Sequence, residues 1–274
     1  MNRTGRATIA RETVAITERG YYVSPSGRKI DIRKEIAASV AGSRLYRPDD
    51  FPQPMPTAPP TQPRVEITGE TTLAAARRLA GSDAVALNFA SAKNPGGGFL
   101  NGSEAQEESL ACASALYPCL TRHREMYDYN RALRSCLYSE HMIYSSQVPV
   151  FRDDAGALLN EPYTVSIITA PAVNAGAVLR SGAGEDQLIR PVMEARLANL
   201  LWVAHQHGHR TIILGAWGCG VFRNDPWIIA QLFEEALGPN GRLAGWFDHI
   251  VYAVYDRSER QDVMTAFRKS VTPE

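Results

Sequence analysis

The sequence predicts an α/β fold, in which a sheet buried on both faces is covered by helices. Short runs rich in apolar residues recur along the chain, as is typical of strands with no solvent-facing side. Stretches with helical spacing of apolar residues separate these runs, and strands that alternate with helices indicate helices packed on a sheet. The expected strands are 64–67, 84–90, 163–169, 211–216 and 249–254; the expected helices are 72–81, 103–120, 184–208, 225–238 and 258–271.

A proline-rich connector precedes this pattern. Residues 48–63 hold seven of the 17 prolines, which excludes a helix or a central strand there. We therefore divide the chain into an N-terminal extension with its connector, residues 1–63, and a main domain, residues 64–274. The extension has too thin a core to stand alone and should pack on the main domain. Its expected elements are a helix over 6–19, a hairpin over 21–32 and a helix over 33–41.

Composition argues against several classes of protein. The 29 Lys and Arg residues balance 29 Asp and Glu residues, which argues against a general nucleic-acid-binding surface. We find no apolar run of about 18 residues and no apolar signal core at the N-terminus, so we expect no membrane association and a cytoplasmic protein. The four cysteines form no C-x-x-C pair, which disfavours a cysteine zinc site.

A glycine-rich loop follows the expected strand 84–90. Three successive glycines, Gly96 to Gly98, allow a ligand to approach the main chain closely. Ser103 and Gln106 fit a capping box, which would place Glu107 and Glu108 in the first turn of the next helix. A simple turn followed by a solvated acidic helix start is the structural alternative. The position after a buried strand favours a ligand site, because such sites lie beyond the carboxyl ends of strands.

A second glycine-rich loop, residues 215–224, follows the expected strand 211–216. Its glycines can expose successive N–H groups that form a nest for a diphosphate. Asp225 and Pro226 then open a helix as N-cap and first helical residue. The loop matches neither the Walker pattern nor G-x-G-x-x-G. Phe222 could stack on a ribose or fill the core, and a purely structural loop stays an open alternative.

The two loops together resemble the poly(ADP-ribose) glycohydrolase family. That family combines three glycines, a short spacer and Gln-Glu-Glu, and here seven residues separate Gly98 from Gln106-Glu107-Glu108. The segment Gly218–Phe222 resembles the family's diphosphate-binding loop. The resemblance covers most of residues 64–274, and the compact size matches bacterial-type members. It implies a macrodomain-like fold, a three-layer α/β/α sandwich, here with an N-terminal helical extension.

The resemblance also implies residue roles. Glu108 would be the catalytic residue, and Glu107 would hold the ribose at the scissile bond. The implied substrate-binding residues are Asn94 at the same ribose, Gly97 and Gly98 near the diphosphate, Gln106, the second-loop residues Gly218, Cys219, Gly220, Val221 and Phe222, and Glu70 as a candidate adenine contact.

The implied reaction is hydrolysis of the ribose–ribose O-glycosidic bonds of poly(ADP-ribose), which releases ADP-ribose. A carboxylic acid must protonate the leaving oxygen as an oxocarbenium-like ion forms, and Glu108 would serve as acid and then as base. If Glu107 is ionised, it would favour the protonated form of Glu108 by like-charge repulsion. Neighbouring helical residues point about 100° apart, so an irregular helix start is expected. The N-terminal extension is expected to cap the pocket, so that cleavage starts from chain ends.

Two other functions stay open on the sequence alone. The protein could be an ADP-ribose reader without catalysis, or a hydrolase of single ADP-ribose marks. In each case ADP-ribose, its polymer and ADP-ribosylated proteins are the expected partners. We expect no cofactor and no metal. His205 and His209 have the four-residue spacing of helical ligands, but Gly208 should end that helix. Residues 127–129 are expected to lie in a loop.

Overall fold

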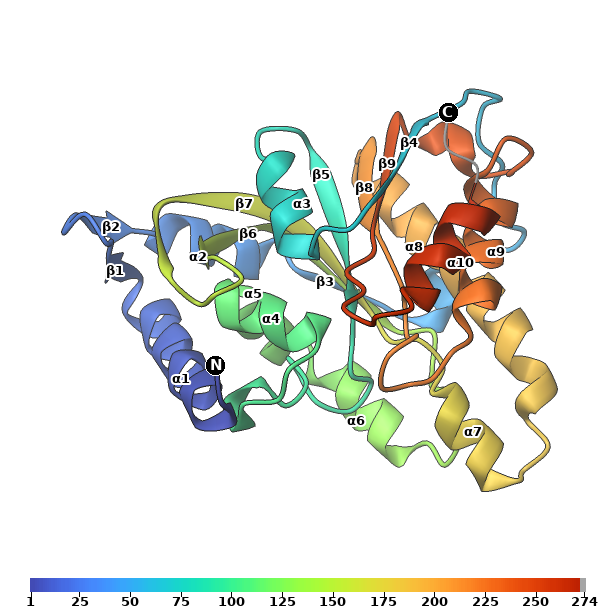
Figure 1. Cartoon of the computed structure of the whole chain (residues 1–274), viewed down its shortest axis with the longest axis horizontal. Helices are drawn as coiled ribbons and strands as arrows, with labels where there is room; N and C mark the ends of the chain where they lie inside the picture. The colour runs from blue at the N-terminus through green and yellow to red at the C-terminus, as the bar shows by residue number, and fades with distance from the viewer. Residues whose placement is uncertain (272–274) are drawn as a thin grey trace.

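The computed structural model describes residues 1–271 and is built on a seven-stranded mixed sheet (Figure 1). Strand β6 runs antiparallel to both of its neighbours, and the other pairs are parallel. Because β5, β8 and β9 are parallel neighbours, the loops that follow them meet at one edge of the sheet. The strand order is β3 (Arg44–Tyr46), β6 (Met142–Arg152), β7 (Leu158–Ala170), β5 (Ala84–Phe89), β8 (Thr211–Leu214), β9 (His249–Ala253) and β4 (Arg64–Thr68).

Helices cover both faces of the sheet, which confirms the expected three-layer α/β/α sandwich. Alternate residues of the central strands enter opposite cores: Val85 and Leu87 of β5 pack on one side, Ala84 and Ala86 on the other. The first core contains α7 (Ala175–Ser181), α8 (Ile189–Gln206), α9 (Pro226–Leu237) and α10 (Asp262–Ser270). The second contains α1 (Arg3–Arg19), α2 (Arg33–Ala41), α3 (Thr72–Arg78), α4 (Gln106–Ala113), α5 (Leu116–Thr121) and α6 (Arg124–Ala132).

Two sequence-based expectations about these elements are wrong. The single helix expected over 103–120 is two helices, because Ser114 adopts an extended conformation and bridges to Val150 of β6. Residues 127–129, expected in a loop, lie in α6. Strand β6 was not anticipated at all. A register shift between Ser145 and Val148 breaks its alternation and hides the strand pattern.

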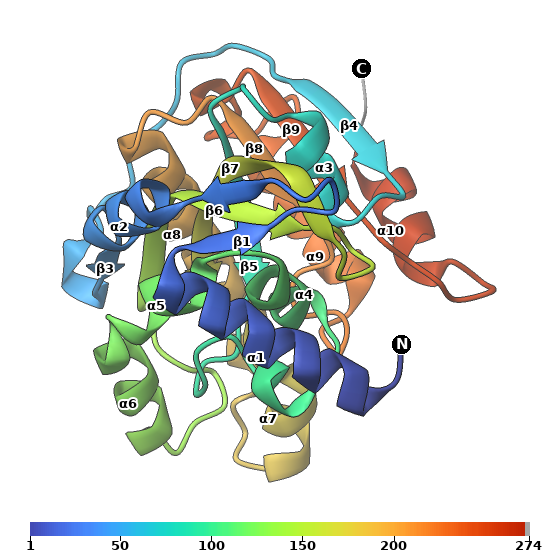
Figure 2. The same ribbon diagram turned by 90° about the vertical axis from the view of Figure 1, so that its left-hand side faces the viewer.

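The N-terminal extension contains the expected helix, hairpin and helix, the hairpin strands being β1 (Tyr21–Val23) and β2 (Lys29–Asp31). It also supplies β3, which pairs with β6 at one edge of the main sheet. Figure 2 shows α1 lying across the side of the molecule that carries α4 and α5. The extension therefore shares both the sheet and a core with the rest of the chain, while a domain division at residue 63 stays a prediction.

A buried arginine attaches α1 to the sheet. Arg152, at the end of β6, is 3% exposed. Its guanidinium donates to Thr13 Oγ1 at 3.0 Å, to the Glu12 carboxylate at 2.8 Å and to the Gly156 carbonyl at 2.8 Å. These bonds tie two residues of α1 to the β6–β7 hairpin.

We predict that Arg152→Met lowers the free energy of unfolding by about 2–4 kcal/mol, because buried partners lose a charged donor. Urea denaturation of the purified protein measures this change. Arg11→Met is the control, because Arg11 lies on the exposed side of α1, the helix that Arg152 attaches. This variant should change stability by less than about 0.5 kcal/mol. A loss of equal size in both variants would contradict the anchoring role.

Candidate active site

A cavity of about 680 Å³ opens where the loops after β5, β8 and β9 meet. It is lined by both glycine-rich loops, by the start of α4 and by the segment after β9. The residues that the sequence places at the site and that line it are Asn94, Gly97, Gly98, Gln106, Glu107, Glu108, Gly218, Cys219, Gly220, Val221 and Phe222. The structure thus brings the two loops together at one cavity, as the positions after buried strands predict.

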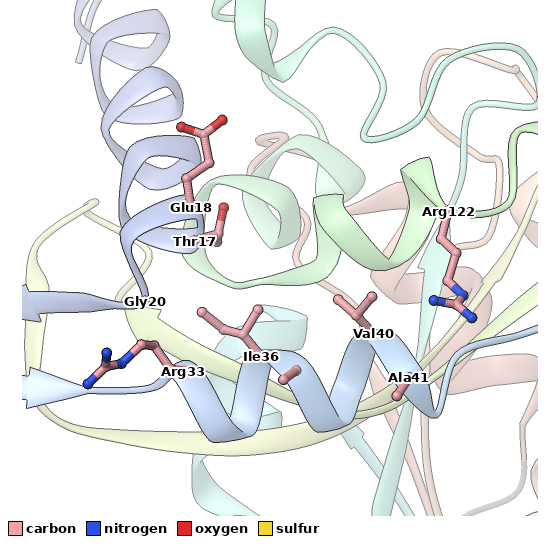
Figure 3. Close-up of a pocket in the computed structure, with 9 residues that line it drawn as sticks. Thr17, Glu18, Gly20, Arg33, Ile36, Val40, Ala41 and Arg122 are labelled. Atoms are coloured by element: carbon pink, nitrogen blue, oxygen red, sulfur yellow. The ribbon is translucent and has the colours of Figure 1, made fainter.

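A second cavity, of about 430 Å³, lies between α1 and α2 (Figure 3). Ile36 and Val40 of α2 point into it, and Arg122 borders it at the end of α5. Neither glycine-rich loop contributes to its lining, and its walls are mostly aliphatic. The larger cavity is therefore the candidate active site.

Two expectations about the larger cavity fail. Within the part of the chain that the structure describes, no residue of 1–63 lines the cavity, so the expected N-terminal cap is wrong. Glu70 does not line it either. Its carboxylate forms a salt bridge with Arg78, while the next residues, Thr71 and Thr72, face the cavity.

The triple-glycine loop folds back over the first turn of α4. Gly97 has φ 61°, a conformation that favours glycine. A Cβ atom on Gly97 would collide with the Glu108 carboxylate and would lie 3.1 Å from Glu107 Oε2. Both carboxylates therefore converge on one glycine. Since Glu107 and Glu108 lie within the α-helix α4, the expected irregular helix start is wrong. The folding of the loop, and not a distorted turn, makes the two side chains meet.

The expected capping box is also wrong, because α4 begins at Gln106 with Ala105 as its N-cap. Gln106 does not reach back to Ser103. Its Oε1 accepts from the Phe89 N–H at 2.8 Å, and its Nε2 donates to the Leu87 carbonyl at 2.7 Å. Gln106 thus fastens the start of α4 to the end of β5 and sets the height of the two glutamates above the sheet.

Glu107 is buried beneath the loop. Its Oε2 accepts from the Ser91 N–H at 2.6 Å, and Asn88 Nδ2 lies 3.4 Å from Oε1. Burial raises the pKa of Glu107 to about 8, although the Ser91 N–H favours the charged form. Glu107 is therefore mostly neutral at pH 7, so the condition for its repulsion of charge on Glu108 is not met there.

Glu108 is half-buried and lines the cavity. Its Oε1 accepts from the Gly98 N–H at 2.9 Å. This bond holds the carboxylate against the loop, at the mouth where a ligand enters. Glu108 is thus placed to exchange a proton with a bound molecule, and the more deeply buried Glu107 is not in the same environment.

The second glycine-rich loop presents unpaired main-chain donors. Among the described residues, the N–H groups of Gly220, Val221 and Phe222 have no hydrogen-bond acceptor, and Val221 is 80% exposed. Asn224 supports the loop from behind, with its Nδ2 donating to the Gly218 carbonyl at 3.1 Å. Three successive free N–H groups form a nest that suits a phosphate anion.

The side chains of this loop differ in their exposure and chemistry. Burial raises the pKa of the Cys219 thiol to about 12, so Cys219 is no nucleophile at neutral pH. Phe222 lines the cavity and also packs against the apolar core, which leaves both of its expected roles open.

A third loop, between β9 and α10, also lines the cavity, and the sequence does not predict its part in the site. Tyr255 lines the cavity and is 52% exposed, and the Arg257 guanidinium lies 4.7 Å from its ring centroid. The Asp256 carboxylate holds the loop by accepting from the N–H groups of Ser258 and Val263. The available signal was positional: these residues directly follow the expected strand 249–254.

The histidines of 205–209 have structural partners. His207 and His209 bind the hydroxyl groups of Tyr46 and Tyr144, each at 2.8 Å. His205 stacks on Trp246. Across residues 1–271 no group of three or more His, Cys, Asp or Glu side chains could hold a metal ion. Within the same range no helix is both long and apolar enough to span a membrane. Metal-independent activity stays a prediction.

Comparisons with known proteins identify relatives of this chain. A family model described as "Microbial-type PARG, catalytic domain" matches residues 10–153. The poly(ADP-ribose) glycohydrolase of Thermomonospora curvata is 47% identical with a TM-score of 0.92, covering 97% of this chain and 99% of that chain. Its structure bound to the inhibitor ADP-HPD matches over the same shares with 48% identity and a TM-score of 0.90.

A second organism provides a further relative. The poly(ADP-ribose) glycohydrolase of Deinococcus radiodurans in complex with ADP-ribose is 46% identical with a TM-score of 0.80. That match covers 86% of this chain and 96% of that chain. A search of curated proteins found no match.

The raised pKa of Glu107 predicts a pH-dependent cost to stability. Between an unfolded pKa of about 4.5 and a folded pKa of about 8, the folded protein keeps a proton that the unfolded chain has released. Stability therefore falls as pH rises through this window, by up to about 1.4 kcal/mol per pH unit. Glu107→Gln removes this titration, so its stability relative to the native protein should be greater at pH 7.5 than at pH 5.

Urea denaturation at the two pH values measures this effect. Glu18→Gln, on an exposed part of α1, controls for the loss of one carboxyl group. If the two variants showed the same relative stability at both pH values, Glu107 would not carry the buried proton.

Proposed function

Because the chain belongs to the poly(ADP-ribose) glycohydrolase family, we propose that it hydrolyses the ribose–ribose O-glycosidic bonds of poly(ADP-ribose) and releases ADP-ribose. The observation that carries this proposal is the meeting of two carboxyl groups and a nest of free N–H groups in one cavity. The carboxyl groups fit proton transfer at a glycosidic bond, and the nest fits the diphosphate of the same ligand.

The strand order supports one orientation of the ligand. β5, β8 and β9 lie side by side, and neighbouring strands are about 4.8 Å apart. The glutamates stand by the end of β5, the N–H nest follows β8, and Tyr255 follows β9. Ribose, diphosphate and adenosine have the same order in ADP-ribose. Tyr255 then offers a ring for the adenine base to stack on, a role that the sequence assigned to Glu70.

In this orientation Glu108 performs the proton transfers. It delivers a proton to the oxygen that leaves C1 of the terminal unit's ribose, and the C1–oxygen bond breaks as an oxocarbenium-like ion forms. The Glu108 carboxylate then takes a proton from water as that water attacks C1, which restores the acid and yields ADP-ribose. Neutral Glu107 has both a donor and an acceptor oxygen, so it can hold a ribose hydroxyl. Asn94, on the exposed loop, would contact the same ribose.

A reader without catalysis is not favoured, because a buried acid with a raised pKa costs stability that simple binding does not require. Hydrolysis of single ADP-ribose marks would use the same cavity and is the alternative that a substrate comparison tests. The proteins that carry the polymer are proposed partners. The cytoplasmic location stays a prediction.

We predict that cleavage starts at polymer ends, so that free ADP-ribose is the first product. Asp154, at the β6–β7 hairpin, accepts a hydrogen bond of 2.8 Å from Thr71, and both residues line the cavity. The hydrogen bond between Thr71 and Asp154 closes part of the rim of the cavity, which is the role expected of the N-terminal extension. Chromatography of early time points on a long polymer provides the measurement. Long internal fragments appearing before ADP-ribose would show that the polymer passes through the cavity.

We predict different defects for the two glutamate variants. Glu108→Gln keeps the size of the side chain but cannot exchange the proton, so the turnover rate should fall by about 100- to 10,000-fold while ADP-ribose binding stays within a few-fold. For Glu107→Gln, a larger share of the lost activity should come from weaker substrate binding, because the proposed role of Glu107 is to hold the ribose. Polymer turnover and calorimetric titration with ADP-ribose separate the two effects. Near-normal turnover by Glu108→Gln would refute the mechanism.

A further inference from the structure

The strand order directs the polymer out of the cavity on the side of β5 where β7 and β6 lie. The second glycine-rich loop also reaches this side, because the Gly176 N–H of α7 donates to the Phe222 carbonyl at 2.9 Å. The scissile bond lies over the end of β5, and the terminal unit extends from there across β8 and β9. On the other side of β5 the sheet continues with β7 and then β6. The unit next to the terminal one, which carries the leaving oxygen, therefore lies over the segments that follow β7 and precede β6. This step rests on the proposed function.

These segments carry Tyr138 and Arg180, and the neighbouring loops after β5 and β8 add the cations Lys93 and Arg223. Tyr138 precedes β6, and its ring centroid is 5.9 Å from that of Phe222, which lines the cavity. The Nζ atom of Lys93, from the triple-glycine loop, lies 6.0 Å from the same tyrosine ring. Arg180 lies on α7, which follows β7, and Arg223 directly follows Phe222. Figure 1 shows α7 at the lower end of the molecule with α6 beside it.

Within residues 1–271, Lys93, Arg180 and Arg223 form no salt bridge. A Cβ atom placed on Gly176 would lie 3.0 Å from Arg223 Cδ and 3.3 Å from Arg180 Nη1, so the two arginines flank one point. Both side chains therefore border the same glycine, and an anion bound there would balance their positive charges.

The backbone of this region is strained and firmly held. Four non-glycine residues among those described have positive φ, and two of them are Tyr138 (62°) and Arg223 (57°). Such strain persists only where the surroundings enforce it, and it gathers at functional sites. Arg196 holds the segment that contains Tyr138. Its fully buried guanidinium donates to the carbonyls of Leu137 at 3.0 Å and Pro171 at 3.0 Å. The tyrosine is therefore presented in a fixed position.

We propose that Lys93, Tyr138, Arg180 and Arg223 form a second polymer subsite, which binds the adenosine diphosphate part of the penultimate ADP-ribose unit. The adenine base stacks on the half-buried ring of Tyr138, as bases do on aromatic side chains. The diphosphate binds the cations, of which the two guanidinium groups can each make paired hydrogen bonds to phosphate oxygens. The subsite holds the leaving group, so it acts on polymer and not on free ADP-ribose.

The test compares two double variants of the full-length protein. Lys93→Met/Arg180→Met removes two cations of the subsite and leaves the second glycine loop unaltered. Lys29→Met/Arg19→Met is the matched control, because Lys29 and Arg19 lie over Tyr21 in the same way, at 3.9 and 5.4 Å, far along the chain in the N-terminal extension. Each protein is assayed with poly(ADP-ribose), with an ADP-ribosyl nitrophenyl conjugate that lacks a second diphosphate, and by calorimetric titration with ADP-ribose.

We expect the subsite variant to raise KM for polymer by about tenfold, from the loss of two charge-assisted phosphate contacts, with kcat little changed. Its KM for the conjugate and its affinity for ADP-ribose should stay within about twofold of native. The polymer KM of the native protein should rise more steeply with salt than that of the variant. The control variant should match the native protein in every assay, and circular dichroism melting verifies that all three fold.

Three outcomes overturn the subsite, and the third also overturns the proposed function. An unchanged KM for polymer in Lys93→Met/Arg180→Met refutes it directly. An equal loss of affinity for free ADP-ribose shows that these cations serve the terminal unit instead. A native protein that binds ADP-ribose but cleaves no polymer refutes the proposed function, and the subsite with it. Should the double variant melt early, the single variant Arg180→Met, at an exposed position, repeats the comparison with a smaller expected shift.

Discussion

The contact on which the site depends is that between the triple-glycine loop and the first turn of α4. Main-chain N–H groups of the loop bind the two carboxyl groups, Ser91 to Glu107 and Gly98 to Glu108. The absence of a side chain at Gly97 allows both carboxyl groups to approach the same point. Without this contact, neighbouring residues of a regular helix would direct their carboxyl groups apart. The loop therefore converts two adjacent glutamates, which a helix separates, into one pair at the mouth of a cavity.

Hydrogen bonds from two other parts of the chain support this contact. Below it, Gln106 fixes the start of α4 to the end of β5. Outside it, α1 of the N-terminal extension braces the far end of the loop: the guanidinium of Arg3 donates to the Asn101 carbonyl and that of Arg6 to the Gly102 carbonyl, each at 2.9 Å. An extension that carries no recognisable motif thus contributes to the active site without lining it, by limiting the movement of the loop that positions the acids.

The sequence predicted the parts of this arrangement that are local. Buried strands, glycine loops and the adjacent glutamates are visible in short windows, and the loops after buried strands were correctly expected to meet. The expectations that failed concern residues whose partners are distant in the sequence. Gln106 fits a capping box locally, yet its side chain binds main-chain groups of β5. The bulge in β6 hides a strand whose partner lies in β7, and Tyr255 becomes part of the cavity only because β9 lies beside β8. No pattern within a window could reveal these pairings.

The burial of Glu107 changes how the acid pair works. An ionised Glu107 would repel charge from its neighbour, but a pKa of about 8 means that Glu107 is mostly neutral at pH 7. In the proposed mechanism Glu108 gives its proton to the leaving oxygen, and a charged Glu107 would then place two negative groups beside one glycine, which is costly in a partly buried site. A neutral Glu107 avoids that cost. In the proposed mechanism, burial of Glu107 thus keeps a second negative charge away from the carboxylate that Glu108 becomes after the first step.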